Sequence, residues 1–555
     1  MKNLITLSLL TSAALMGATP TTGDILRQVE PLKLPTTQKE LPSLGGEYKA
    51  PLEVKDEFKT YVKSFKFSGN SVIDSQTLST LVKPYENKEL GINALKEVAS
   101  LITKYYRDHG YFVARAYIPA QTMEDGIIEI AVIEGSYGNF EMKNSSHVKT
   151  SEVQGFMDQL KSGQKVSTMS LERQMLLIND LSGAQVTNAE VSPGQAVGTS
   201  DFRITVSPTN KYSGYAVVDN YGSRYTGEER LSAGVSVNSL TGVGDTLTLS
   251  GLVSNTRDLK NGRLSYDRPL GYSGLKGGMS ASITDYTLSE IANYDASGQT
   301  NTYSAYISYP VLKTKAHTTS LEFDIDHKEM KDTSGTTGAT DLSRKKIDAM
   351  SIKLNDTQST SLANHPGQLS TSLALTGGHL YLDKAVAGDE ALNSKGTYTK
   401  ATLTLNHNQY LTPSFNLQTT LKAQKSFGKN LDSSEDISVG GSNGVRAYED
   451  SELSGDQGYA LSLELGYKLP SIQQVSHNLS LFVDHAEVWK NTTIINSDKN
   501  ERSLDAIGLG YTMNFKAFDL KASYAHGFGG ESTPVSEVEF STCKDKFLVQ
   551  GMVRF

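Results

Sequence analysis

The sequence predicts a mainly β protein, in which a transmembrane β-barrel of about 16 strands follows two small α+β units and a short N-terminal helix. Three observations predict it. Beyond residue 208, many segments alternate apolar and polar residues, as barrel strands do. Before residue 208, helical and strand patterns are mixed. The mean hydropathy of −0.35 excludes a bundle of membrane-spanning helices, because each would need about 20 mostly apolar residues.

The overall composition excludes several other classes. The 555 residues include 61 acidic and 53 basic side chains, for a net charge of −8, so we expect no nucleic-acid partner. Cys543 is the only cysteine, which excludes an internal disulfide framework and a cysteine-based zinc or iron–sulfur site. The histidines form no metal-ligand motif, and the sequence holds no P-loop and no His-Glu-x-x-His motif. We therefore expect no metal and no other cofactor.

Residues 1–18 are typical of a secretory signal peptide. Lys2 supplies a positive charge, Leu4 to Leu15 form an apolar run, and the small residues Gly17 and Ala18 follow. We expect cleavage near Ala18, so that the mature chain leaves the cytoplasm. The alternative is a short buried helix.

Residues 19–57 are predicted to hold a short helix and a linker. The helix covers residues 22–30, with Asp24 near its start, where a carboxylate suits the helix dipole, and with Leu26 and Arg27 further along. Pro31 ends it. The following residues, to 57, are rich in Pro, Gly, Lys and Glu, as a linker is.

Residues 58–135 and 136–208 read as two small α+β units of similar type. The first is predicted to contain strands at 62–67, 112–118 and 127–133 and a helix at 92–108, closed by Gly110 as the C-cap glycine. The second is predicted to contain helices at 152–160 and 171–181 and a strand at 202–206. Ser170 is the expected N-cap of its second helix, and Gly183 the expected stop.

Residues 209–555 are predicted to form the barrel. Segments such as 231–238, 321–326 and 461–469 alternate strictly, so that Glu322 and Asp324 would be very unfavourable in a dry core. A barrel wall with one face toward lipid and the other toward water accommodates this alternation. At roughly 10 residues per strand plus a turn or loop, this length makes about 16 strands. The chain ends with Phe555 on the expected lipid face. A large soluble β-sandwich or β-helix is the alternative.

Motifs in the first unit carry a family resemblance. Residues 110–121 and 126–135 resemble the signature of a POTRA domain in the outer-membrane transporters of two-partner secretion (TpsB-type; ShlB/FhaC/HecB haemolysin secretion/activation proteins). The segments 176–183, 219–224 and 242–245 resemble the family in the same order along the chain. The signature residues are Gly110, Tyr111, Arg115, Pro119, Gln121, Gly126, Glu134 and Gly135.

Two further motifs resemble the family's lid-loop lock. Val445-Arg446-Ala447-Tyr448 resembles Val-Arg-Gly-Tyr, with Ala447 where many members have glycine, and Phe482-Val-Asp484 resembles Phe-x-Asp. The resemblance implies that a lid loop around 440–457 folds into the barrel and that Arg446 pairs with Asp484. The alternation of residues 479–484 agrees, because it turns Phe482 and Asp484 toward the lumen. In the alternative, Arg446 lies in a solvated surface loop.

The resemblance also implies a location and a partner. The protein would lie in the outer membrane of a Gram-negative bacterium, with its POTRA domains in the periplasm and the 22–30 helix as a plug. It would export a large exoprotein, of haemolysin or adhesin type, recognised through an N-terminal secretion domain. The barrel-assembly machinery would insert the barrel into lipid, with Phe555 as its C-terminal signal.

Three other functions are weighed against this one. Gly440-Gly-Ser442-Asn-Gly444 matches the nucleophile elbow of hydrolases, with His526 as a possible partner, but the elbow needs a helix after the serine. We therefore expect no enzyme. An insertase for other barrels typically carries more than two POTRA units. The hypothesis of a passive porin or uptake receptor does not explain the 150 residues before the barrel.

Overall fold

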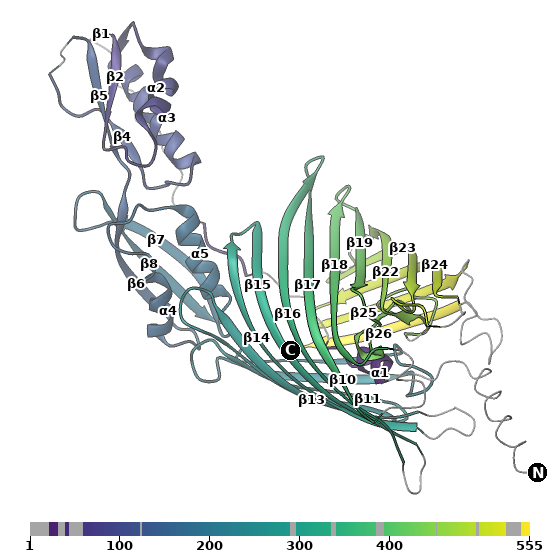
Figure 1. Ribbon diagram of the computed structural model, residues 1–555. Helices are drawn as coiled ribbons and strands as arrows, with labels where there is room; N and C mark the ends of the chain where they lie inside the picture. Colours follow the sequence, from purple (N-terminus) through teal and green to yellow (C-terminus); the bar gives the residue numbers. More distant parts are fainter. Residues whose placement is uncertain are drawn as a thin grey trace, which may run out of the picture.

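The computed structural model describes residues 22–31, 39–43, 59–122, 125–288, 296–334, 340–384, 393–450, 452–495, 499–528 and 545–555. The predicted signal peptide lies outside these residues, as does most of the predicted linker. Figure 1 shows two small units at one end of a large barrel and the short helix α1 (Thr22–Gln28) within the outline of the barrel. Within the described ranges, no helix is both long and apolar enough to cross a membrane.

The first small unit packs helices against a short sheet. Its elements are β1 (Lys59–Val62), β2 (Ser64–Ser68), α2 (Ser75–Val82), η1 (Lys83–Tyr85), β3 (Lys88–Gly91), α3 (Ile92–Asp108), β4 (Arg115–Tyr117) and β5 (Ile127–Ile133). The sheet order is β2-β5-β4, so β2 is an edge strand, and β1 pairs only with β3. The helix α3 has the predicted bounds, whereas the single strand predicted over 62–67 is split at Lys63 and α2 was not predicted.

The second small unit repeats this plan. It consists of β6 (Ser136–Asn144), α4 (Thr150–Met157), α5 (Thr168–Asn179), β7 (Ala184–Pro193) and β8 (Thr199–Pro208), with the sheet order β6-β8-β7. The predicted N-cap of α5 is wrong. Ser167 is the cap, because its Oγ accepts a hydrogen bond from the backbone N–H of Ser170 at 3.2 Å, so the helix begins one turn earlier than its apolar pattern suggests.

The barrel is closed by 16 antiparallel strands, as predicted. They are β9 (Tyr212–Asp219), β10 (Arg230–Asn238), β11 (Thr246–Ser254), β12 (Leu259–Pro269), β13 (Lys276–Leu288), β14 (Ala296–Lys313), β15 (His317–Ser334), β16 (Thr340–Leu362), β17 (His365–Lys384), β18 (Gly396–Tyr410), β19 (Phe415–Ser426), β22 (Gln457–Lys468), β23 (Val475–Trp489), β24 (Glu501–Phe515), β25 (Phe518–Gly527) and β26 (Asp545–Arg554). Each strand pairs with its neighbour in the chain, and β26 closes the barrel on β9.

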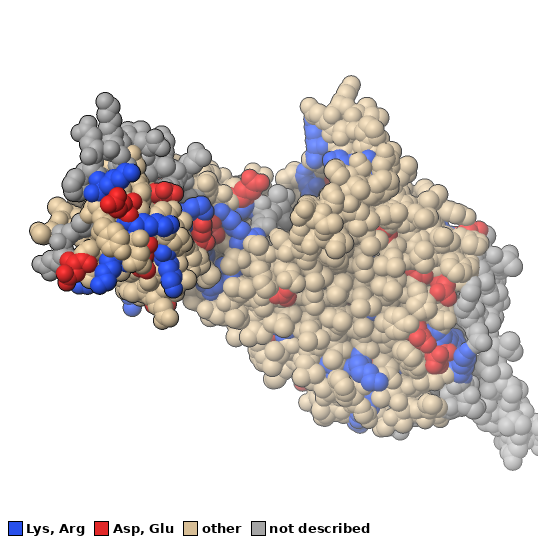
Figure 2. All heavy atoms as spheres, turned by 90° about the horizontal axis from the view of Figure 1, so that it is seen from above, with Lys and Arg blue, Asp and Glu red and all other residues tan. Residues whose placement is uncertain are grey.

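The two faces of the barrel wall follow the alternation of the sequence. On β15, Leu321 and Ile325 lie on the outer face, 47% and 45% exposed. Between them, Glu322 and Asp324 face the lumen, where both pair with the Lys353 ammonium at 3.2 and 2.8 Å. Figure 2 shows charged side chains gathered over the small units, whereas most of the barrel surface in that view is formed by other residues. The outer wall therefore suits lipid, and the inner wall suits water.

Candidate functional site

A long loop folds back into the barrel. It comprises residues 427–456, apart from Ser451, and we call it the lid loop; it contains η2 (Ser433–Glu435), β20 (Ile437–Ser438) and β21 (Ser454–Gly455). Its apolar side chains Val439 and Val445 are fully buried and form one cluster with Phe482 and Leu504 of the barrel wall. The loop is therefore packed into the lumen like a small core and is not a solvated surface loop.

Arg446 is the centre of this packing. Its guanidinium donates Nε to Oδ2 and Nη2 to Oδ1 of Asp484, both at 2.9 Å, and its backbone N–H donates to the same carboxylate at 3.1 Å. The guanidinium also lies 3.3 Å above the centroid of the Phe482 ring. A bidentate pair stacked on an aromatic face is the arrangement to which arginine is best suited. The pairing implied by the sequence motif is present in the structure.

Two acceptors complete the arginine's environment. Glu464 accepts from Nη1 at 2.7 Å and Ser462 accepts from Nη2 at 3.0 Å; both lie on β22, next to β23. The Asp484 side chain is 1% exposed and that of Arg446 is 15% exposed. The lid loop itself covers the pair and shields it from water. Removing one partner of such a buried pair typically costs about 3–5 kcal/mol.

The remaining motif residues fit closely around the Arg446–Asp484 pair. Ala447, at the position where glycine is common, is buried and does not adopt a positive φ, so its Cβ causes no backbone strain. Tyr448 is buried against Gly527 of β25. Phe482 lies over Gly508 of β24, where a Cβ would approach its ring to 2.2 Å. Gly508 therefore leaves the space that the Phe482 ring needs.

The helix α1 lies in the lumen beside the lid loop. Its Ile25 is 1% exposed and packs in a cluster with Tyr286 and Leu288, at the end of β13. Leu26 packs against a second cluster on the wall, which includes Met330 and Leu380. The sequence predicted that this helix ends at residue 30, but it ends at residue 28, because Val29 and Glu30 continue as a turn. Asp24 lies within the helix, but its side chain is outside the described part of the structure.

Polar contacts of α1 reach both the wall and the lid loop. Arg27 donates Nη1 to the backbone oxygens of Ser433 and Asp436 at 3.0 and 3.4 Å. Thr22 donates to Oδ1 of Asp332 at 2.6 Å, and Arg230 donates to the backbone oxygen of Gln28 at 2.9 Å. The helix α1 and the lid loop are therefore in direct contact.

The lid loop is also tied to strands β15, β16 and β18 by ion pairs. Glu435 pairs with Lys328 of β15 at 2.6 Å and with Lys400 of β18 at 2.9 Å. Asp432 pairs with Lys345 of β16 at 2.9 Å. All three lysines face the lumen; Asp432 is the N-cap of η2, and Glu435 is its last residue. The segment 432–436 is thus held by the wall on one side and bears α1 on the other.

In the first small unit, Glu134 and Gly135 hold a loop. The Glu134 carboxylate accepts from the backbone N–H groups of Ser71 and Val72 at 2.5 and 2.7 Å and from the Tyr106 hydroxyl at 3.1 Å. Burial would raise the pKa of Glu134, but these hydrogen bonds outweigh it and hold the pKa below its ordinary value. Burial and the adjacent carboxylate raise the pKa of Tyr106. Gly135, at φ +76°, leaves no room for a side chain beside Val113.

The other signature residues shape the hairpin of β4 and β5. Gly110, at φ +88°, ends α3, and Tyr111 packs edge-on against Tyr106. The Gln121 side chain pairs with the backbone of Glu129 through two hydrogen bonds of 2.8 Å, as a neighbouring strand would. The remaining three complete the hairpin: Arg115 is exposed on β4, Pro119 accepts from Gln121 at 3.3 Å, and Gly126 accepts from the Lys63 N–H at 2.8 Å.

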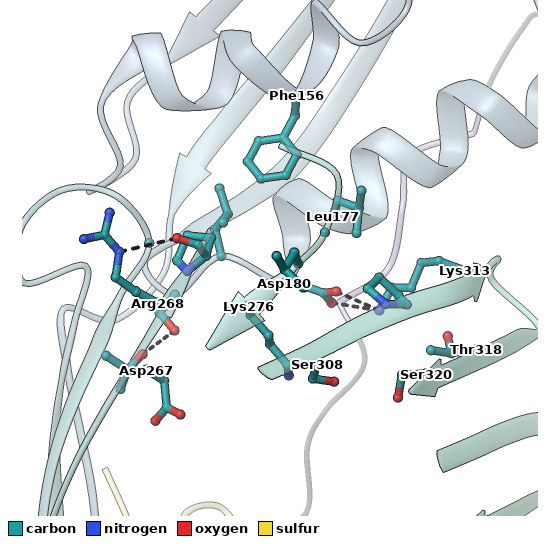
Figure 3. Close-up of a pocket in the computed structure, with 18 of the residues that line it drawn as sticks. Phe156, Leu177, Asp180, Asp267, Arg268, Lys276, Ser308, Lys313, Thr318 and Ser320 are labelled. Carbon is teal, nitrogen blue, oxygen red and sulfur yellow. Dashed lines mark hydrogen bonds and ion pairs between the residues drawn. The ribbon is translucent and has the colours of Figure 1, made fainter. Parts of the chain in front are cut away.

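The second small unit is fastened to the near end of the barrel. Arg173 donates to the backbone oxygen of Pro310 at 2.9 Å, and Asp180 pairs with Lys313 at 2.8 Å. Tyr272, in the turn between β12 and β13, packs on Phe156. Figure 3 shows a cavity below this joint, with Asp180 and Leu177 on one side and strands β12 to β15 on the other. Its volume is about 390 Å³, and it lies between the small unit and the lumen wall.

The match to a hydrolase elbow has no support in the fold. Ser442 lies in a turn of the lid loop, and among the described residues from there to β22 no helix follows. His526 lies on β25, where it pairs with Asp545 at 2.7 Å. Across the described ranges, no group of three or more His, Cys, Asp or Glu side chains is arranged to hold a metal ion.

A closed barrel with a helix and a lid loop in its lumen, and two small α+β units at one end, defines an outer-membrane transporter barrel. The chain belongs to the haemolysin secretion/activation protein family ShlB/FhaC/HecB, whose model matches residues 198–515. A second model, the ShlB-type POTRA domain, matches residues 61–135. The family resemblance seen in the sequence is confirmed.

Individual relatives agree with this family. The heme/hemopexin transporter protein HuxB of Haemophilus influenzae is 28% identical over 509 residues, which cover 89% of each chain. The outer membrane transporter CdiB of Dickeya dadantii is 22% identical and covers 80% of this chain and 79% of its own. The solved structure of CdiB from Escherichia coli has a TM-score of 0.73 at 21% identity, covering 93% of this chain and 94% of that one. The protein is an outer-membrane transporter of two-partner secretion, with its POTRA domains in the periplasm.

Proposed function

We propose that the barrel lumen is the path of the exoprotein and that α1 and the lid loop close this path at rest. The observation that carries the proposal is that both elements lie in the lumen and touch through Arg27, Ser433 and Asp436. A polypeptide cannot share the lumen with α1, so α1 must leave before export. The division into plug and linker (19–57), two POTRA domains (58–135 and 136–208) and barrel (209–555) belongs to the same proposal.

Within this scheme, Arg446 and Asp484 act as the lock of the lid loop. The lock holds the loop against one side of the wall, with Val445, Tyr448 and Phe482 packed around it. The bidentate geometry and the burial of the pair support this role. A loop held so tightly keeps the rest of the lumen clear once α1 has gone.

The first POTRA domain is the proposed receptor for the exoprotein. Its strand β2 is an edge strand, and a groove beside it is lined by Phe65, Phe67, Ser75 and Ile127, among others. An extended segment of the exoprotein's N-terminal secretion domain adds to such an edge through main-chain hydrogen bonds, and the groove selects alternate side chains. The cavity between the second POTRA domain and the barrel then lies on the way into the lumen.

We propose that the exported protein, which we call the passenger, is a large exoprotein of the haemolysin or adhesin class. The relative HuxB is named a heme/hemopexin transporter and matches along 89% of its length, so a haem-acquisition exoprotein belongs to the same set. We infer that the protein has no enzymatic activity, and that folding of the passenger outside the cell drives its export. Insertion by the barrel-assembly machinery agrees with Phe555, which is 64% exposed on the lipid face.

The culture-medium proteome of cells with and without this chain tests the proposal. Loss of one large secreted protein on deletion is the expected result, and it identifies the passenger. Loss of many barrels from the envelope, with the medium intact, would instead indicate an insertase. The BamA barrel of Haemophilus ducreyi shares the fold, with a TM-score of 0.50 at 16% identity, but this likeness alone carries no function.

A further inference from the structure

The barrel closes where its last strand, β26, meets its first strand, β9, and we call this line of contact the seam. The two strands form five residue pairs, from Gln550↔Asp219 to Arg554↔Tyr215. On its other side, β26 forms nine pairs with β25, and β9 forms eight with β10. Within the described residues, the part of β26 before Gln550 therefore has no strand beside it on the side of β9.

An unpaired backbone would be unfavourable in this part of β26. Phe547 is 60% exposed on the outer face, so the backbone beside it belongs to the wall that faces lipid. Lipid offers no hydrogen bond to a free N–H or carbonyl group. An open strand edge can also pair with another chain. A closed barrel thus needs a substitute for the missing strand.

The strand β9 ends where Asp219 starts a turn. Its Oδ1 accepts a hydrogen bond from the backbone N–H of Tyr221 at 3.0 Å and another from Nε of Arg230 at 2.8 Å. The side chains of Asp219 and Arg230 are 2% and 9% exposed, so this ion pair is buried. The chain therefore turns toward β10 and does not continue beside β26.

Asn220 occupies the position of the missing strand residue. Its backbone N–H donates to the oxygen of Val549 at 3.2 Å, its Nδ2 donates to the oxygen of Phe547 at 2.7 Å, and its Oδ1 accepts from the Val549 N–H at 2.7 Å. A carboxamide carries both a donor and an acceptor, as a peptide group does. The side-chain partners lie 327 and 329 residues further along the chain, so these contacts are not part of a local turn.

The other end of the seam is closed by the end of the chain. Gly214 and Phe555 exchange two backbone hydrogen bonds, at 2.8 and 3.0 Å. A Cβ on Gly214 would come within 2.5 Å of the Phe555 ring, so the glycine leaves space for this ring. The seam is thus fastened by the main chain near the POTRA domains and by the side chain of Asn220 at the far end.

We propose that Asn220 is a positioning residue that completes the seam, and that the seam stays closed during export. Its carboxamide supplies the hydrogen bonds that the next residue of β9 would supply. Asp219 and Asn220 thereby have complementary roles in the segment 219–224, because the first ends the strand and the second replaces it. These roles do not depend on α1 or on the lid loop.

Hydrogen exchange of residues 545–549 in the full-length protein tests the role of Asn220. Asn220→Leu keeps the size of the side chain but neither donates nor accepts, and we expect this segment to exchange about tenfold faster, because two hydrogen bonds are lost. Asn220→Asp keeps the acceptor for Val549 and loses the donor, so its effect should be smaller. If the exchange of residues 221–229 increases and that of 545–549 does not, Asn220 acts only on the turn and the inference is overturned.

The matched control is Asn478→Leu. The Asn478 carboxamide donates to the Thr512 hydroxyl at 3.3 Å, and its backbone lies within complete strand pairs on both sides. Residues 545–549 should therefore exchange in this variant as they do in the parent protein. An equal increase in Asn478→Leu and Asn220→Leu would overturn the special role of Asn220.

A disulfide bond across the seam tests whether the seam stays closed during export. Val217 and Met552 lie directly opposite each other across it and are both buried, at a spacing that a disulfide can span. With Cys543 replaced by serine, Val217→Cys and Met552→Cys should form the bond without loss of exported passenger from the medium, relative to Val217→Cys alone. Loss of export only in the bridged protein would show that the seam must open, which would overturn the inference.

Discussion

The two elements in the lumen are held in different ways. The lid loop has its own buried apolar cluster, a bidentate ion pair between Arg446 and Asp484, and further ion pairs at Glu435. The helix α1 has seven residues, and the hydrogen bonds of Arg27 go to backbone oxygens. An isolated helix of this length is not stable in water, so α1 keeps its form only while docked. The comparison agrees with the proposed function, in which the lid loop stays in place and α1 leaves the lumen.

The largest expected effect comes from breaking the lid loop's lock. Arg446→Ala leaves Asp484 buried without its partner, which typically costs about 3–5 kcal/mol, so we expect export to be lost while the barrel still folds. The measurement is the amount of exoprotein in the medium at equal amounts of folded barrel. Asp484→Ala should behave alike, and Arg257→Ala, at an exposed arginine of the β11–β12 turn, serves as the control. Normal export by both lock variants would show that the lid assignment is wrong.

Deleting α1 tests the other half of the comparison. Removal of residues 22–30 should raise the conductance in a planar bilayer, because the helix fills part of the lumen and its loss leaves the lid loop in place. Export should persist, since the contacts of Arg446 and Asp484 in the described part of the structure do not involve α1. Unchanged conductance would mean that this segment is not the plug.

A smaller effect is expected from removing Arg27, the side chain that links α1 to the lid loop. Arg27→Ala removes the charged donor to Ser433 and Asp436, and a hydrogen bond to a charged group contributes about 1.5–3 kcal/mol. The lower value corresponds to roughly a tenfold shift toward the open pore. Single-channel recordings measure it, with Lys66→Ala, in the first POTRA domain, as the control. An open fraction equal to that of the control would remove Arg27 from the contacts that hold the plug.

The smallest effect is expected outside the lumen, at Glu134. Its pKa is held below the ordinary value of 4.5, so its contribution to stability is present above that value and is lost as the pH falls through the lowered pKa. Glu134→Gln should remove this acid sensitivity from the first POTRA domain and leave the conductance unchanged. Hydrogen exchange of residues 59–122 at neutral and acid pH measures it. Equal acid sensitivity in both proteins would contradict the role of Glu134.

Much of the fold could be predicted from the sequence because a barrel wall repeats one local rule. Alternation placed Phe482 and Asp484 toward the lumen, and the two lie there at 0% and 1% exposure. The pairing of Arg446 with Asp484 followed from two motifs and not from alternation. Its full environment did not follow, because Ser462 and Glu464 reach the arginine through the register of β22 and β23, which no local pattern encodes.

Other features depend on contacts between distant segments. The contact of Arg27 with the lid loop joins residues more than 400 positions apart, and the contact of Asn220 with β26 joins residues more than 300 positions apart. The helix α2 was missed although Asp74 caps it, because its eight residues carry few apolar side chains. The cap of α5 at Ser167 was misplaced because the apolar pattern begins only at Leu171.

The most direct test of the central claim is the amount of exported passenger in the medium, compared between Arg446→Ala and the deletion of residues 22–30. Both proteins are expressed at equal levels of folded barrel. The account predicts that Arg446→Ala loses export and that the deletion keeps it, because the lid loop must stay and α1 must leave. Full export by Arg446→Ala together with loss of export on deletion of α1 would contradict it.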